Sequence, residues 1–280
     1  DNSQGFTIWG NWGPFAAANY NMGWHSKGGH DRTFGTNAKA WDWCSVNNAG
    51  FEYYQNAKKD GIGLPPHNPR IWVFRHQSNA SCAPRLRRVW HPIGYSSNSG
   101  WSNFFINITA GRLLTYTNTL LKFALPDIVI GTGGGYNTYD IYESVNHELS
   151  HASHFNKVGS AFWAKYVNYI ITYGKKYDHP YGDASCNNSG FCGVGEMWGY
   201  AMGYIRTYEK YQQKPKNGQS KWFQPNLLYD LMTEKILTKK QIFDCLSSDV
   251  TSHALLKQKM ISRYPSKKDS IIAKFSRYGF

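Results

Sequence analysis

The chain has 280 residues, of which 41% are apolar, and its 31 Lys and Arg against 18 Asp and Glu give a net charge of +13. This length can bury a hydrophobic core, and no apolar run approaches the roughly eighteen residues that a membrane-spanning helix needs. We therefore expect a globular protein without a transmembrane segment. The basic residues are scattered and contain no nucleic-acid-binding motif, so a solvated basic surface is expected and a nucleic-acid partner is not.

The cysteines indicate an exported protein. Cys186 and Cys192 flank a turn-rich stretch that could bring two sulfurs within bonding distance. We predict a disulfide here, formed in an oxidising compartment, and the alternative is two thiols in a loop. Cys44 and Cys82 are a weaker second pair. The first residues resemble no export signal, so we expect that such a signal has been removed and that the protein is secreted or exposed at the cell surface.

The first part of the chain predicts strands. Up to about residue 110 it is rich in Gly, Asn, Ser and Trp, and short runs such as Arg70–Arg75 predict strands between long loops. From Leu113 to Leu125 the apolar spacing becomes helical. The β-branched run Asp127–Gly131 then predicts a buried or edge strand that ends in a glycine-rich turn.

The rest of the chain predicts mostly helices. Their expected ranges are 139–157, 160–173, 194–211, 225–236, 239–247, 250–263 and 266–278. Thr238 and Gln241 predict a capping box at the start of one of them. The predicted fold is therefore α+β. It has a strand- and loop-rich part over about 1–125 and an active-site, mostly helical part over about 126–280, which together form one catalytic domain over 1–280.

The helix predicted over 139–157 carries the pattern His-Glu-x-x-His, as His147, Glu148 and His151. Positions four apart lie on one face of a helix, so both imidazoles can reach one Zn²⁺ at about 2.0–2.1 Å. Glu148, beside the first histidine, can face the attacking water and act as general base. We predict a zinc site here, and the alternative is a helix that carries two solvated or core histidines.

A catalytic zinc usually takes three protein ligands. His154 is about 10.5 Å along a continuous helix from His147, too far to share the ion. We expect His154 beside the site, in contact with substrate, or on the surface. Glu196 is the preferred third ligand, because Gly199 and Gly203 share its helical face and would let that helix approach its neighbour closely. The alternative is a glutamate that only favours the start of its helix.

His-Glu-x-x-His followed by a glutamate on a later helix resembles the gluzincin zinc peptidases, over about residues 126–204. The resemblance implies a zincin-like fold in which Asp127–Gly131 is the edge strand that pairs with an extended peptide substrate. It also implies a tyrosine or histidine that stabilises the oxyanion. Tyr200 is the candidate for this role because it shares a helical face with Glu196, and Tyr204 is the reserve.

The predicted function is a zinc-dependent peptidase that acts on a protein or peptide substrate, acidic or glycosylated, through a water activated by Zn²⁺ and Glu148. Two alternatives stay open. One is a zinc hydrolase of non-peptide amides or esters, and the other is a non-catalytic surface protein that binds glycans or proteins through its many Trp and Tyr. If Glu196 does not bind the metal, the next candidate ligands are Asp183, His179 and His154.

Overall fold

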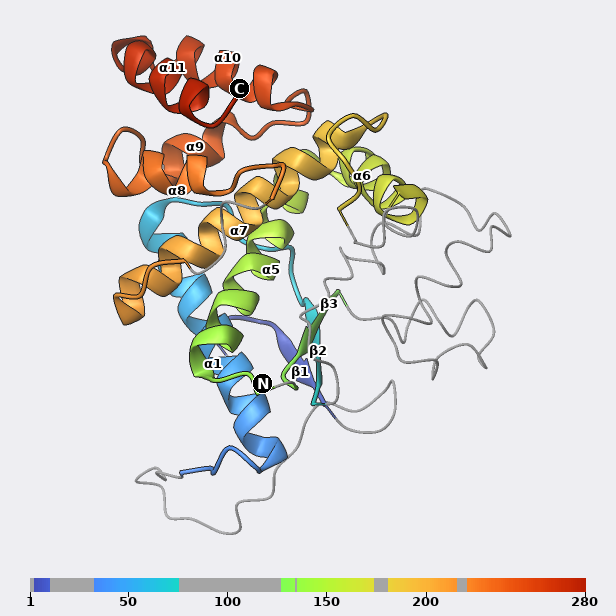
Figure 1. The fold of residues 1–280 in the computed structure, drawn as a ribbon. Helices are drawn as coiled ribbons and strands as arrows, with labels where there is room; N and C mark the ends of the chain where they lie inside the picture. Colours follow the sequence, from blue (N-terminus) through green and yellow to red (C-terminus); the bar gives the residue numbers. More distant parts are fainter. Residues whose placement is uncertain (1–2, 11–32, 76–126, 134, 174–180, 216–220) are drawn as a thin grey trace.

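The computed structural model describes residues 3–10, 33–75, 127–133, 135–173, 181–215 and 221–280. This part of the chain combines a small sheet with many helices, which gives a mixed, helix-rich α+β architecture (Figure 1). This confirms the predicted α+β class, while the zincin-like fold stays a prediction. The helix expected from Leu113 to Leu125 lies outside the described residues, as does Cys82. No helix within them is long and apolar enough to cross a membrane.

The sheet consists of β1 (Thr7–Trp9), β2 (Arg70–Phe74) and β3 (Ile128–Gly131), in that order. Both pairings are parallel, with Trp72 opposite Val129 in the second. The strands β2 and β3 are those that the sequence predicts, and β3, like β1, is an outer strand of the sheet among the described residues. All four of its residues are buried, however, so its pairing with a substrate stays a prediction.

Helix α1 (Lys39–Asp60) lies between β1 and β2 in the chain, where only strands and loops were expected. The expectation is wrong for this segment, because Asn, Gly and aromatic residues of modest helix propensity hid a helical pattern. Its buried positions repeat every three or four residues, as on one face of a helix; they include Val46, Ala49, Tyr53 and Ala57.

The remaining helices confirm the predicted series, with ends that differ by a few residues. They are α5 (Thr138–Val158), α6 (Ser160–Tyr173), α7 (Ser189–Tyr211), α8 (Asn226–Thr233), α9 (Lys239–Cys245), α10 (His253–Arg263) and α11 (Lys268–Arg277), with a short 3₁₀ turn at Pro265–Lys267. The capping box of Thr238 and Gln241 is present at the start of α9. Helices α5 and α7 pack side by side in the centre, and α10 and α11 lie at the end of the molecule away from the sheet (Figure 1).

One buried apolar cluster runs through both parts of the chain. It contains Phe6 and Ile71 from the sheet region, Leu149 and Trp198 from the central helices, and Phe275 near the C-terminus. The arrangement as a single catalytic domain stays a prediction, but this cluster joins the sheet region, the central helices and the C-terminal helices.

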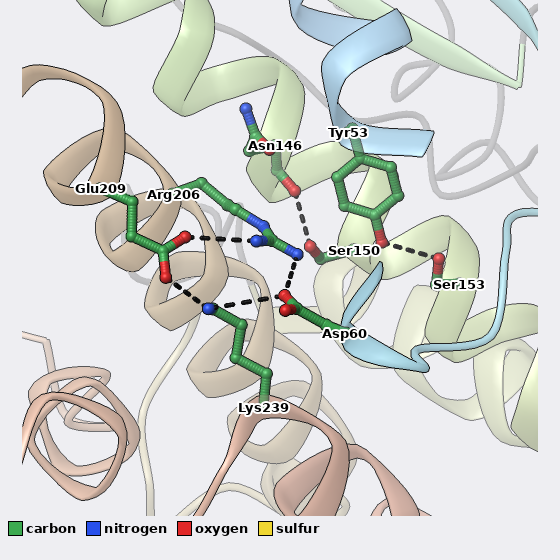
Figure 2. A network of polar contacts seen from close by, with 8 residues as sticks. All are labelled: Tyr53, Asp60, Asn146, Ser150, Ser153, Arg206, Glu209 and Lys239. Atoms are coloured by element: carbon green, nitrogen blue, oxygen red, sulfur yellow. Dashed lines mark hydrogen bonds and ion pairs between the residues drawn. The ribbon is translucent and has the colours of Figure 1, made fainter. Parts of the chain in front are cut away.

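A network of charged side chains ties three distant segments together beside the central helices (Figure 2). Arg206 of α7 is buried, and its guanidinium lies 2.6 Å from Asp60 at the end of α1 and 3.2 Å from Glu209. Lys239, at the start of α9, contacts both of these carboxylates. The network therefore fixes α7 against α1 and α9.

Replacing Arg206 by Ala is expected to lower the free energy of unfolding by about 2 kcal/mol, because Asp60 and Glu209 lose the buried cation between them. This loss of stability is smaller than for a fully buried ion pair, because both carboxylates are partly exposed. Urea denaturation measures it. Arg277→Ala is the matched control, since this arginine is 66% exposed and should change stability by less than about 0.5 kcal/mol. Equal effects of the two substitutions would contradict the role of the network.

Candidate metal centre

Helix α5 carries the histidine motif on a long, regular scaffold. The side chain of Asn137 accepts a hydrogen bond from the backbone of Asp140, and the side chain of Asp140 accepts one from the backbone of Asn137, so a complete capping box starts the helix. The helix then continues without a break to Val158. The residues that it places at the centre of the protein are therefore held on one rigid element.

His147, Glu148 and His151 are all buried, and their ligand atoms lie within 4.8 Å of one another. The two imidazole Nε2 atoms are 2.9 Å apart, and Nε2 of His147 lies 3.8 Å from Oε1 of Glu148. Two ring nitrogens that face the same point, with a carboxylate beside them, form the kind of donor set that divalent zinc prefers. This group could therefore hold a metal ion.

Glu196, on α7, reaches the same point from the opposite side. Its carboxylate oxygens lie 3.6 Å from Nε2 of His147 and 3.3 Å from Nε2 of His151. One oxygen accepts a hydrogen bond from the hydroxyl of Tyr166 on α6, while Oε2 is buried with no hydrogen-bond partner in the described part of the chain. A bound cation would satisfy such an anionic oxygen, which has no donor in the interior.

The charges in this group favour cation binding. Burial and the neighbouring His151 lower the pKa of His147 to about 3, which leaves its ring neutral. Burial would raise the pKa of Glu196, but the two histidines and Tyr166 outweigh it and lower this pKa to about 2. Burial also opposes protonation of His151, yet Glu196 beside it raises the pKa of His151. A buried carboxylate that holds a proton on a neighbouring histidine can hold a metal ion in place of that proton.

Glycines on α7 allow this close approach, as the sequence predicts. A β-carbon at Gly199 would lie 2.5 Å from Cε1 and 2.8 Å from Nε2 of His151, and 3.1 Å from Cε1 of His147. A β-carbon at Gly203 would lie 3.0 Å from the backbone oxygen of Glu143. The two positions therefore set the distance between α5 and α7.

Gly199→Ala is expected to weaken zinc binding at least tenfold and to cost about 1–3 kcal/mol of stability, because the new methyl group displaces both imidazoles. Competition with a zinc-chelating dye measures the affinity, and urea denaturation measures the stability. The matched control is Gly35→Ala, since an added β-carbon at Gly35 meets no atom of the described residues within 4 Å. Zinc affinity that is the same in both variants would show that Gly199 does not control the site.

Two tyrosines border the histidines. The ring of Tyr200, the predicted oxyanion stabiliser, lies 4.3 Å from the ring of His147, and its hydroxyl is 2.7 Å from that of Tyr181. Burial raises the pKa of both hydroxyls well above the ordinary value, so both remain protonated donors at neutral pH. Tyr204 is buried, and its ring packs 5.8 Å from that of Tyr200.

The other predicted ligands are placed differently. The carboxylate of Asp183 accepts hydrogen bonds from the backbone and the hydroxyl of Ser185 in the turn before α7. His179 lies outside the described residues. His154 is fully buried against Phe162 and Trp163, so the interpretation of a surface histidine is wrong, and the unbroken helix agrees with the argument that His154 is too far along α5 to join His147 on one ion.

His154 should make the metal-free protein sensitive to acid. Burial lowers its pKa to about 3, and neither ring nitrogen has a hydrogen-bond partner among the described residues. The unfolded chain takes up a proton near pH 6.5 while the folded protein does not, so this residue costs no stability above that pH. Below it, stability should fall by about 1.4 kcal/mol per pH unit until about pH 3.

The substitution His154→Leu removes this proton uptake. The free energy of unfolding should therefore fall by about 1.4 kcal/mol less between pH 6 and pH 5 than in the wild-type protein. Urea denaturation of both proteins in chelator at pH 8, 6 and 5 measures this difference, and the pH 8 values serve as the reference. The same pH dependence in both proteins would show that His154 is not the source of the acid sensitivity.

The predicted disulfide between Cys186 and Cys192 is wrong, because the structure contains thiols at both positions. Cys192 lies within α7 and packs into an apolar cluster with Trp163 and Tyr166, whereas Cys186 precedes the helix. The turn-rich sequence between them is partly the first turns of α7 and not a loop that closes on itself. The predicted export thereby loses its main support and stays a prediction.

The sequence and the structure were compared with models of known protein families, with curated proteins and with solved structures, and no match was found.

Proposed function

We propose that this protein is a zinc-dependent peptidase of the gluzincin type, with a zincin-like catalytic fold and with His147, His151 and Glu196 as the three metal ligands. The observation that carries the proposal is the convergence of both Nε2 atoms and the Glu196 carboxylate on one buried point, with Glu148 beside it. Two neutral imidazoles and one carboxylate leave a fourth position open for catalysis.

Bound zinc would supply a water of lowered pKa and polarise the carbonyl of the scissile bond. Glu148 accepts the proton of the attacking water and passes it to the leaving amine. The hydroxyl of Tyr200 donates a hydrogen bond to the carbonyl oxygen as negative charge develops there, and the hydroxyl of Tyr181, 2.7 Å from it, holds the Tyr200 hydroxyl in place. Tyr166 holds Glu196 in place by its hydrogen bond, as residues behind metal ligands commonly do.

The direct test is incubation of the zinc-loaded full chain with a mixed peptide library, followed by mass spectrometry of the products. We expect cleavage that a zinc chelator abolishes and added zinc restores. Simple amides and esters are assayed in parallel. Hydrolysis of these compounds without any peptide cleavage would favour the alternative hydrolase, and no hydrolysis of either kind would favour a binding protein.

A further inference from the structure

We propose that Lys221 recognises a carboxylate of the substrate beside the scissile bond, so that the peptidase prefers acidic peptides or peptides cut near a free C-terminus. This inference rests on the proposed function and names the substrate class of the same site. Its basis is the position of Lys221, the lack of a carboxylate partner for this lysine among the described residues, and the charge around the metal centre.

Lys221 lies at the border of the metal centre. Its Nζ atom is 4.3 Å from the centre of the Tyr200 ring and 5.1 Å from that of the Tyr181 ring. The Tyr200 ring in turn lies 4.3 Å from the ring of His147. The ammonium group is therefore separated from a metal ligand by one aromatic ring, in the region where the tyrosine hydroxyls would meet a substrate.

The ammonium group has no carboxylate partner within 4.0 Å among the described residues. Two other partly buried lysines of the described chain do have one: Lys239 pairs with Glu209, and Lys274 pairs with Glu234. Aromatic faces offset part of the cost of burying a cation, but they do not neutralise it. A half-buried ammonium group whose side-chain contacts among the described residues are aromatic rings can gain an ion pair from a bound ligand.

With zinc bound, Lys221 gives the region of the metal centre a net positive charge, which favours an anionic substrate. Two neutral histidines and one carboxylate leave a bound Zn²⁺ with a net positive charge, and Glu148 cancels about one unit of it. Lys221 then adds a positive charge that no protein group within the described residues neutralises by direct contact.

The test compares peptides of one sequence that differ in a single carboxylate. One pair has Glu or Gln next to the cleaved bond, and another has a free or an amidated C-terminus. We expect wild-type protein to show about a tenfold higher kcat/KM for the charged member of at least one pair. The pair that shows the preference identifies the source of the carboxylate.

Lys221→Met should bring this ratio close to one, and Lys221→Arg should restore most of it. The matched control is Lys165→Met, because Lys165 also lies over an aromatic ring, that of Phe191, outside the metal centre, and this variant should keep the preference. Equal rates for both members of both pairs in wild type, or an unchanged preference in Lys221→Met, would overturn the proposal while the peptidase function stands.

A binding measurement separates this inference from the function itself. The same peptides, fluorescently labelled, are titrated with zinc-loaded Glu148→Gln protein, and binding is followed by anisotropy. Tighter binding of the charged member, lost in Glu148→Gln with Lys221→Met, supports carboxylate recognition even if no peptide is cut. Equal binding of both members overturns it.

Discussion

Replacing Glu148 by Gln is expected to lower the rate of peptide cleavage by at least about 10³-fold while one zinc ion stays bound. The carboxylate is buried, and its Oε1 lies 3.8 Å from Nε2 of His147, close to where the attacking water would be held. Glutamine keeps the shape of the side chain but cannot accept the proton of the water. Zinc affinity and folding should therefore be nearly unchanged.

The measurement is kcat/KM on the best peptide from the library, together with the zinc content of the same preparation. Glu143→Gln is the control, because it removes a carboxylate from the same helix five residues earlier. Cleavage by Glu148→Gln at more than a tenth of the wild-type rate would show that another group acts as the base.

Replacing Glu196 by Ala is expected to weaken zinc binding by at least about 100-fold, because even residues behind the ligands contribute tenfold to 100-fold. The substitution removes the anionic oxygens that lie 3.6 Å and 3.3 Å from the two Nε2 atoms. It also removes the group that raises the pKa of His151. Competition with a chelating dye at pH 7 measures the loss.

Glu209→Ala is the matched control for this experiment. Glu209 lies on the same helix, but its carboxylate contacts Arg206 and Lys239 in the network of Figure 2, away from the histidines. Its replacement should leave zinc affinity unchanged. If Glu196→Ala binds zinc as tightly as Glu209→Ala does, then Glu196 is not a metal ligand.

The fold could be predicted where a local pattern carried it. The helices beyond Thr138 follow from apolar periodicity and capping residues, and β2 and β3 follow from β-branched runs. Helix α1 could not be recognised in this way, because its buried face is built partly from Asp42, Gly50 and tyrosines. A β-carbon at Gly50 would lie 2.8 Å from the ring of Phe6, so the need for a glycine there is visible only in the packed structure.

The site, too, could be predicted only where a local sequence pattern indicates it. His147, Glu148 and His151 lie within five residues of one another, and the glycines beside Glu196 reveal a helix that must approach its neighbour closely. Tyr166, Tyr181 and Lys221 were missed. They come from other segments and reach the centre only through the packing of α6 and of the chain on either side of α7, for which the sequence contains no local signal.

The most direct test of the account is the metal content of the purified protein, measured by plasma mass spectrometry after dialysis against zinc and then against metal-free buffer. We predict about one zinc per chain in wild type and a clear loss in His147→Ala, with circular dichroism showing that both remain folded. A folded wild-type protein that retains no zinc would contradict the metal centre, and with it the proposed peptidase.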